Sequence, residues 1–215
     1  MLKIATALAA TLLAGTAAAD TVLTATLTNG QENPPAVPTL TTGGARPASF
    51  GTATFTIDDA MTQMSFFATI YNIDVTGGQT LDANDNLTAA HLHAGPAVSP
   101  STNGPVVWGF FGSPFNNNNP NDNVVTAFAS GVGGTFSGTW NLTEGNNTTF
   151  AAQLGNILAG RSYINFHTVQ FGGGEIRGNL VTAVPEPETL ALLKAGGLLL
   201  AGRARQQHRR ARAAA

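Results

Sequence analysis

The chain has 215 residues, 10 basic and 12 acidic side chains, and no cysteine. Without cysteine, disulfide bonds, thiolate metal sites and cysteine nucleophiles are excluded. The charges are unevenly placed, because positions 20–182 hold three arginines against ten acidic residues, whereas positions 183–215 hold six basic residues against two acidic ones. A central region of net charge about −7 without Lys or Arg clusters argues against nucleic-acid binding.

Residues 1–19 have the three parts of a secretory signal peptide. Lys3 supplies the positive charge, an apolar stretch follows from Ile4 to Gly15, and Ala17-Ala18-Ala19 supplies a small-residue cleavage site. The apolar stretch is too short to span a bilayer comfortably. We therefore expect a signal helix, export of the protein and a mature chain that begins at Asp20.

Alternation of polar and apolar residues dominates positions 20–182 and predicts an all-β domain. Clusters of Gly, Asn and Pro separate the alternating segments and mark turns. The predicted strands are 22–27, 52–57, 64–73, 87–93, 106–111, 124–129, 134–142, 162–168 and 175–181. So many short strands in one domain, long enough to form its own core, predict a β-sandwich or a β-barrel. Of these we expect an immunoglobulin-like or superoxide-dismutase-like β-sandwich.

Two segments between these strands depart from the alternation. Phe150, Leu154, Ile157 and Leu158 have helical spacing before Gly160, so we expect one short helix that ends at this glycine. Positions 116–123 are rich in asparagine and contain a proline. This second segment should be a long exposed loop.

The triplet His91-Leu92-His93 is a candidate metal-binding motif. In a strand, the side chains at i and i+2 point to the same face, so both imidazoles should lie together. His167 and Glu175 lie on two later predicted strands, and their side chains could reach the same face if these strands are neighbours. Three imidazoles and one carboxylate form a ligand set that suits zinc or copper.

The same residues also allow a purely structural interpretation. Asn165 shares a face with His167, and Arg177 should pair with Glu175, which would disfavour a metal ion there. Glu32 sits in a rigid turn before Pro34-Pro35, where a structural role is expected. In this alternative, the histidines, Asn165, Arg177 and Glu32 form a polar network that fixes the strand register.

Other patterns bear on sugar binding and catalysis. Four aromatic residues close in sequence could form a carbohydrate-stacking surface: Trp108, Phe110, Phe111 and Phe115. Aromatic residues in β-proteins are more often part of the core. The chain contains no G-x-S-x-G elbow and no P-loop, and we expect a protein that is not an enzyme.

The C-terminal segment, positions 183–215, is expected to be a sorting tail. Pro185-Glu186-Pro187 precedes a short apolar run from Leu190 to Ala201, which is followed by a cluster of arginines. These three parts in this order resemble the PEP-CTERM sorting signal. The resemblance implies an apolar sorting helix, transient membrane association, and cleavage near the motif by an exosortase-type membrane protease. An ordinary tail anchor with cytoplasmic arginines is the alternative.

The central region, positions 20–182, resembles the CHRD domain, named from chordin. The resemblance rests on six segments in order: 27–35 (LTNGQENPP), 51–55 (GTATF), 89–93 (AAHLH), 103–107 (NGPVV), 163–168 (YINFHT) and 174–178 (GEIRG). CHRD domains occur in the growth-factor antagonist chordin and in many bacterial exported proteins without an agreed biochemical activity. The His-x-His strand with a distant third histidine also resembles copper-zinc superoxide dismutase, which is a β-sandwich.

Three functions remain open on this basis. The first is a non-enzymatic module of a Gram-negative cell surface or of the exopolysaccharide matrix, with exopolysaccharide or other surface components as partners. The second is a zinc- or copper-binding protein or a redox protein that uses His91, His93 and His167, with Glu175 as a further candidate ligand. The third is a carbohydrate-binding module built on the aromatic residues near Trp108.

Overall fold

The computed structural model describes residues 19–183 and the single residue Arg203. The expected signal peptide before Ala19 and the sorting motif Pro185, Glu186 and Pro187 lie outside the described residues. Where the chain is described, it contains no helix with the length and apolar character needed to cross a membrane.

The described part is mostly β-structure with one α-helix and two short 3-10 helices. The strands are β1 (Thr21–Thr28), β2 (Phe50–Ile57), β3 (Gln63–Tyr71), β4 (Leu87–Ala94), β5 (Val106–Phe111), β6 (Val124–Ala127), β7 (Gly133–Asn141), β8 (Ser162–Thr168), β9 (Ile176–Asn179) and β10 (Val181–Thr182). The helices are α1 (Phe150–Leu158) and the 3-10 turns η1 (Asn29–Gln31) and η2 (Ala83–Asp85). The prediction of an all-β domain with one short helix is therefore confirmed.

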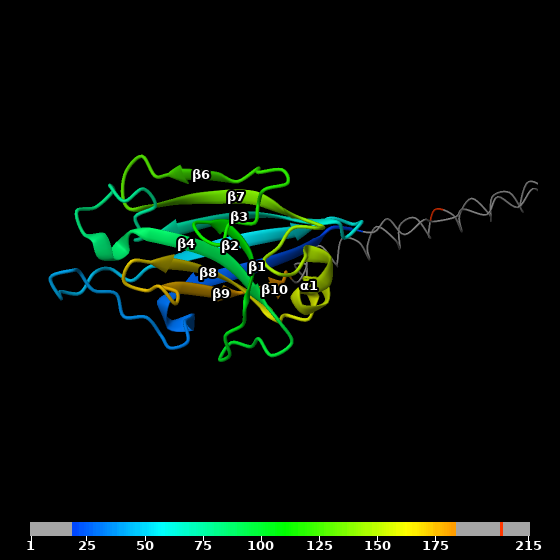
Figure 1. Cartoon of the computed structure of the whole chain (residues 1–215), viewed down its shortest axis with the longest axis horizontal. Helices are drawn as coiled ribbons and strands as arrows, with labels where there is room; N and C mark the ends of the chain where they lie inside the picture. The colour runs from blue at the N-terminus through cyan, green and yellow to red at the C-terminus, as the bar shows by residue number, and fades with distance from the viewer. Residues whose placement is uncertain (1–18, 184–202, 204–215) are drawn as a thin grey trace, which may run out of the picture.

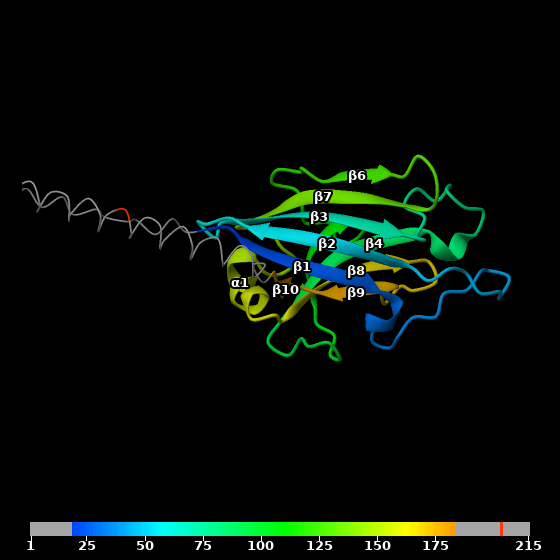
Figure 2. The ribbon, with the colours of Figure 1, turned by 180° about the vertical axis from the view of Figure 1, so that it is seen from behind.

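All strands belong to one antiparallel sheet with the order β5-β4-β8-β9-β1-β2-β3-β7-β6, and β10 pairs with the start of β1. The two halves of this sheet meet between β9 and β1, which share only the residue pair Thr28 and Arg177. Views from opposite sides show β4 in front in one and β1 and β2 in front in the other (Figures 1 and 2). The predicted sandwich of two sheets is thus corrected to a single sheet that curls around its core.

The apolar core lies inside the curl and explains it. Phe66 of β3 contacts Trp108 and Phe110 of β5, which lies in the opposite half of the sheet, with ring centroids 5.7 and 4.6 Å away. All three side chains are buried. Burial of large aromatic surfaces from both halves is the main stabilising contribution to this arrangement.

Strands β4 and β8 are buried on both faces, unlike β1, β2 and β3, which alternate between buried and exposed residues. Their inner face contributes Leu92 and Phe166 to the core. Their outer face carries polar side chains, and loops that follow β4, β5 and β8 cover it. Polar side chains that are buried in this way need hydrogen-bond partners within the protein. Which partners they have determines the chemistry of this outer face.

Two connecting segments complete the domain. The helix α1 begins after Thr149, whose hydroxyl accepts a hydrogen bond from the Ala152 N–H at 3.2 Å, and Gly160 follows its end with φ +69°. The loop at positions 116–123 is less exposed than predicted, because Asn117 is buried and the Glu144 carboxylate accepts hydrogen bonds from the main-chain N–H of Asn118 and Asn119.

Candidate functional site: a buried histidine group

His91, His93 and His167 form one buried group on the outer face of β4 and β8. The two strands are antiparallel neighbours, and His91 lies opposite Asn165, one two-residue step from His167. The three side chains are between 5 and 8 % exposed. One ring nitrogen from each histidine lies within 4.8 Å of the others. The group could therefore hold a metal ion, as the spacing predicted for these three residues.

Each of the three rings uses one nitrogen to contact a main-chain carbonyl. His91 Nε2 lies 3.1 Å from the Ser113 carbonyl, and His93 Nδ1 lies 2.9 Å from the Gly104 carbonyl. His167 Nδ1 lies 3.0 Å from the carbonyl of Gly172. A carbonyl oxygen can only accept a hydrogen bond, so each of these ring nitrogens carries the proton of the neutral imidazole.

The other three ring nitrogens, which are His91 Nδ1, His93 Nε2 and His167 Nε2, therefore carry lone pairs. His91 Nδ1 and His167 Nε2 are 3.1 Å apart, although both act as acceptors in the neutral rings. His93 Nε2 is buried and has no hydrogen-bond partner among the described residues. Lone pairs that converge in this way repel one another unless a proton or a metal ion lies between them.

Protonation is disfavoured because the group is removed from water. Burial lowers the pKa of His91 to about 4, and the neighbouring His167 lowers it further in the same direction. Burial also lowers the pKa of His93 to about 3, against the opposing effect of its hydrogen bond to Gly104. The pKa of His167 is lowered by burial as well. At neutral pH the rings are neutral and their lone pairs are available to a cation.

Glu175, predicted as a fourth ligand, lies outside the histidine group. Its carboxylate forms a buried salt bridge with Arg46, in which the second guanidinium bond is 2.7 Å long, and it also accepts hydrogen bonds from Ser49 and Thr168. The strand alternation does not extend to Glu175, because β9 begins at the next residue and Gly174 has φ +127°. The turn directs the carboxylate away from the histidines.

Arg177 also differs from its prediction, since it forms no pair with Glu175. Its guanidinium donates to the Asn103 side chain at 2.8 Å and to the Ser99 carbonyl at 2.6 Å. The guanidinium carbon lies 3.6 Å from the centre of the Tyr163 ring. The same tyrosine ring stacks on His93, with centroids 4.5 Å apart and planes at 7°. Tyr163 therefore orients the His93 ring and links it to the cation of Arg177.

Glu32 and Asn165 are in direct contact beside the histidine group. The Asn165 amide donates to the Glu32 carboxyl at 2.5 Å, and Glu32 is only 7 % exposed. Burial raises the pKa of Glu32 to about 7, although the Asn165 hydrogen bond and the charge of Arg177 act in the opposite direction. Arg177 forms no hydrogen bond with Glu32, so these three residues are coupled partly by contact and partly by charge alone.

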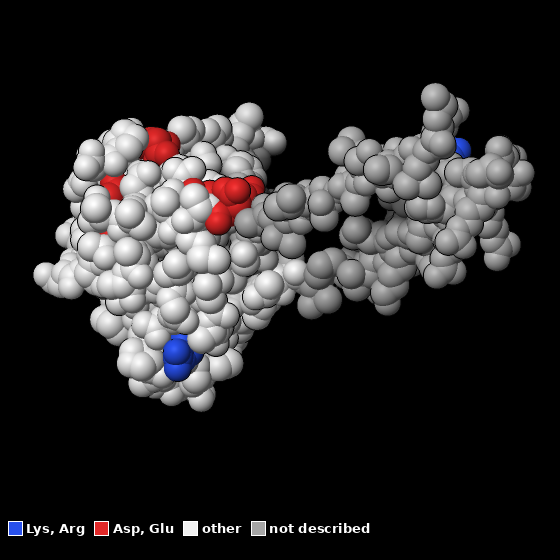
Figure 3. Space-filling view, turned by 90° about the vertical axis from the view of Figure 1, so that its right-hand side faces the viewer, with Lys and Arg blue, Asp and Glu red and all other residues white. Residues whose placement is uncertain are grey.

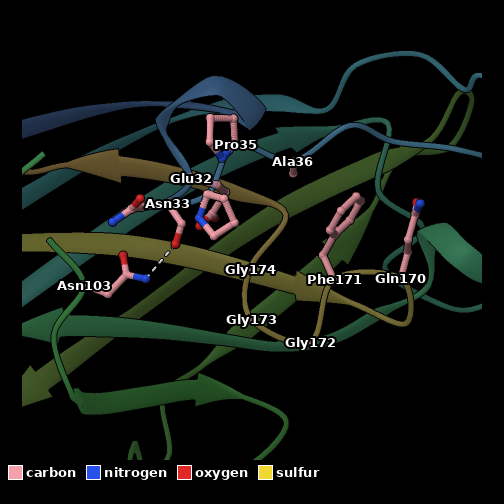
Figure 4. A pocket seen from close by; sticks show the side chains of 11 residues that line it. Glu32, Asn33, Pro35, Ala36, Asn103, Gln170, Phe171, Gly172, Gly173 and Gly174 are labelled. Carbon is pink, nitrogen blue, oxygen red and sulfur yellow. Dashed lines mark hydrogen bonds between the residues drawn. The ribbon is translucent and has the colours of Figure 1, made fainter. Parts of the chain in front are cut away.

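A surface pocket of about 310 Å³ lies next to these residues, and Figure 4 shows its lining. Glu32, Asn33 and Asn103 line one part of the pocket, and the loop through Gly172, Gly173 and Gly174 lines another. Gly172 is also the residue whose carbonyl accepts the His167 N–H. This loop therefore separates the pocket from the histidine group.

The carbohydrate surface predicted around Trp108 does not exist. Trp108 and Phe110 are fully buried in the core, and Phe111 packs edge-on against Phe136. Of the four predicted aromatic residues, only Phe115 is substantially exposed, at 38 %. These rings stabilise the curled sheet instead of binding a ligand.

Several residues around the histidine group were not predicted from the sequence. They are Tyr163 and the three residues that supply carbonyls: Gly104, Ser113 and Gly172. Arg46, the partner of Glu175 outside the group, was not predicted either. Tyr163 could have been found, because it shares the strand face of Asn165 and His167. The carbonyl contacts leave no signal in residue type, since any residue has this group.

Comparison with known proteins gives one match. A family model described as the CHRD domain matches residues 23–180. No curated protein and no solved structure matches the chain. The matched region covers the whole histidine group, its three carbonyl partners, and the residues Tyr163, Arg177 and Glu32.

Proposed function

The chain belongs to the CHRD domain family, and on that premise we propose that its domain binds one zinc or copper ion through His91, His93 and His167. The proposed role is that of an exported, non-enzymatic module of the cell surface or extracellular matrix. The ion would stabilise the domain from within, since the three side chains that would hold it are almost completely buried.

One observation carries the metal proposal: three neutral imidazoles donate their N–H groups outward to carbonyls and direct their lone pairs at one another. Metal-bound histidines characteristically donate their second ring N–H to a carbonyl or carboxylate, which fixes the tautomer and the ring orientation. A polar network that only served the strand register would instead pair donors with acceptors. The contact between His91 Nδ1 and His167 Nε2 instead brings two acceptors together.

The dimensions also support an ion of this kind. Two nitrogens of a tetrahedral zinc site with ordinary Zn–N bonds lie about 3.3 Å apart. His91 Nδ1 and His167 Nε2 are 3.1 Å apart, and His93 lies within 4.8 Å of both. His93 would have to approach the other two nitrogens by up to about 1.5 Å to reach this separation. Among the described residues no carboxylate joins the group, so a water molecule would complete the coordination.

Elemental analysis tests this function directly. The exported protein is purified without a His tag and compared with the His91→Ala/His93→Ala/His167→Ala variant. A matched control is Asp59→Asn, which alters an exposed carboxylate outside the group and within the mature domain. We expect close to one equivalent of zinc or copper in the wild type and the control, and none in the folded triple variant. A metal-free wild type that also fails to bind added zinc or copper would refute the proposal.

We further propose that the chain is exported through residues 1–19 and processed near Pro185-Glu186-Pro187 by an exosortase-type protease. The three-part tail supports this, and so does the end of β10 at Thr182, because cleavage after it would leave the sheet intact. Mass spectrometry of the protein from exosortase-positive and exosortase-deleted Gram-negative cells tests the processing. We expect an N-terminus at Asp20 in the protein from both kinds of cells and a shortened C-terminus only in the protein from exosortase-positive cells. An unshortened chain in both kinds of cells would contradict the proposed processing.

A further inference from the structure

The outer face of β1, β2, β3, β7 and β6 is unusual because it carries no charge. These five strands contain no Asp, Glu, Lys or Arg, and their outward side chains are mainly threonine, serine and aromatic residues. Figure 2 shows this side of the sheet. Figure 3 looks onto one end of the molecule, where acidic residues form separate patches. Exposed sheet edges commonly carry charged side chains that prevent unwanted association. A large exposed patch without charge is a candidate binding surface.

A row of five threonines crosses this face. The strand register places them opposite one another in the order Thr26, Thr52, Thr69, Thr135 and Thr126. Because neighbouring strands are about 4.8 Å apart, the row is about 19 Å long. None of the five hydroxyls is engaged in a side-chain hydrogen bond within the described part of the chain. The row is therefore a line of free donors and acceptors.

An aromatic cluster runs alongside the threonine row. Phe50 and Tyr71 are cross-strand partners one two-residue step from Thr52 and Thr69, and their rings stack with centroids 4.8 Å apart. Phe128 packs on the other side at 5.2 Å from Tyr71. Phe50 and Tyr71 remain 47 and 39 % exposed. The face therefore carries an apolar strip of exposed rings next to a strip of free hydroxyls.

From this combination we infer that the face binds a neutral polysaccharide chain. The C–H surface of a pyranose ring packs on aromatic side chains, while its hydroxyl groups exchange hydrogen bonds with side-chain hydroxyls. A polyanion is disfavoured, since the domain carries a net charge of about −7 and the face offers no cation. A protein partner fits less well, because protein interfaces favour Arg, Met and aromatic residues across their centre and are poor in serine.

The position of the aromatic cluster agrees with this use. Phe50 pairs with Thr28 at the end of β1, whereas β10, the last strand before the tail, pairs with the start of β1 at Leu23 and Thr24. The aromatic cluster therefore lies at the end of the sheet away from Ala183, the last residue of the described domain. A domain held by its C-terminus would present the cluster outward. The inference does not depend on metal binding, because the histidine group lies on other strands.

Affinity electrophoresis of the exported protein in native gels tests the inference. The probes are hydroxyethylcellulose, dextran and galactomannan as neutral polysaccharides, with alginate as the polyanion. We expect at least one neutral polysaccharide to slow the wild type and alginate to leave it unaffected. The double variant Phe50→Ala/Tyr71→Ala should raise the apparent Kd by about tenfold or more. Thr52→Val/Thr69→Val, which removes hydroxyls at nearly constant shape, should also weaken binding.

The matched control is Phe115→Ala, which removes an exposed aromatic ring elsewhere and should leave the mobility shift unchanged. Unaltered binding by the double aromatic variant, or no retardation by any of the three neutral probes, would overturn the inference. Sedimentation equilibrium addresses a second copy of the chain as the occupant. A wild-type dimer that Phe50→Ala/Tyr71→Ala converts to a monomer would likewise overturn it. Metal content, measured in parallel, should be equal in all these proteins.

Discussion

His91 Nδ1 and His167 Nε2 face each other at 3.1 Å, while the opposite nitrogen of each ring already contacts a main-chain carbonyl. With the tautomers that the carbonyl contacts favour, two neutral acceptors at this distance repel each other unless a proton or a metal ion lies between them. The pKa values of both rings are lowered by burial, so a metal ion is favoured over a proton. This contact is the observation on which the proposed metal site rests.

The first prediction concerns stability in the presence of metal. Chelation with EDTA should lower the Tm of the wild type, and excess zinc or copper should restore it, because a ligand that binds only the folded state stabilises it by about 2.7 kcal/mol at 100 times its Kd. Differential scanning calorimetry measures the effect. The His91→Ala/His93→Ala/His167→Ala variant should show the same Tm with and without metal. A metal-dependent shift of equal size in this variant would place the ion elsewhere.

The second prediction concerns the pH at which the metal is released. A histidine of ordinary pKa would begin to lose its metal near pH 6.5, because protons compete for the nitrogen. Burial lowers the pKa of His91 to about 4 and that of His93 to about 3, so protons compete poorly above pH 5. Equilibrium dialysis at pH 7, 6, 5 and 4 should show release mainly below pH 5. Loss of half the metal already at pH 6.5 would contradict the burial of the site.

The third prediction concerns Glu32. Its pKa is raised from 4.5 to about 7, so the folded state favours the protonated carboxyl, and this group destabilises the domain increasingly as the pH rises from about 4.5 to 7. Glu32→Gln keeps an oxygen for the Asn165 amide and removes the charge. The variant should be more stable than the wild type by roughly 1–3 kcal/mol at pH 8 and nearly equal at pH 4.5.

Urea denaturation at the two pH values measures this difference. Asp59→Asn, which alters an exposed carboxylate, serves as the matched control and should show a much smaller change. If Glu32→Gln were less stable than the wild type at pH 8, the ionised carboxylate would have to be stabilised by Arg177 more than burial penalises it.

The fourth prediction concerns the buried ion pair of Arg46 and Glu175, whose side chains are 3 and 0 % exposed. Arg46→Met leaves the Glu175 carboxylate buried without its cation and should cost about 3–5 kcal/mol of unfolding free energy. The double variant Arg46→Met/Glu175→Gln should recover part of that loss. A double-mutant cycle from urea denaturation measures the coupling. Additive effects of the two substitutions would show that the pair contributes no coupling.

The fifth prediction separates core from surface among the aromatic residues. Trp108→Ala removes a fully buried ring and should cost about 3–5 kcal/mol, whereas Phe115→Ala should change the stability by about 0.5 kcal/mol or less. Thermal unfolding of both variants measures the difference. A small effect of Trp108→Ala would contradict its place in the core.

Local patterns in the sequence determined most of the elements. The predicted strands 106–111 and 162–168 coincide with β5 and β8, and the short helix predicted before Gly160 is α1. The two-residue alternation also placed His91 and His93 on one face, because this geometry depends only on neighbouring residues in an extended chain. The third histidine followed from the same rule applied to β8, once β4 and β8 proved to be neighbours.

Tertiary structure alone decided the rest. Whether the strands form two sheets or one depends on which strands pair, and a single residue pair, Thr28 with Arg177, joins the two halves. Glu175 is not a member of the histidine group, because its carboxylate pairs with Arg46, which is 129 positions away in the sequence. The carbonyls that set the histidine tautomers come from loops, where alternation has no meaning. Such contacts depend on long-range packing, which residue types and their spacing do not encode locally.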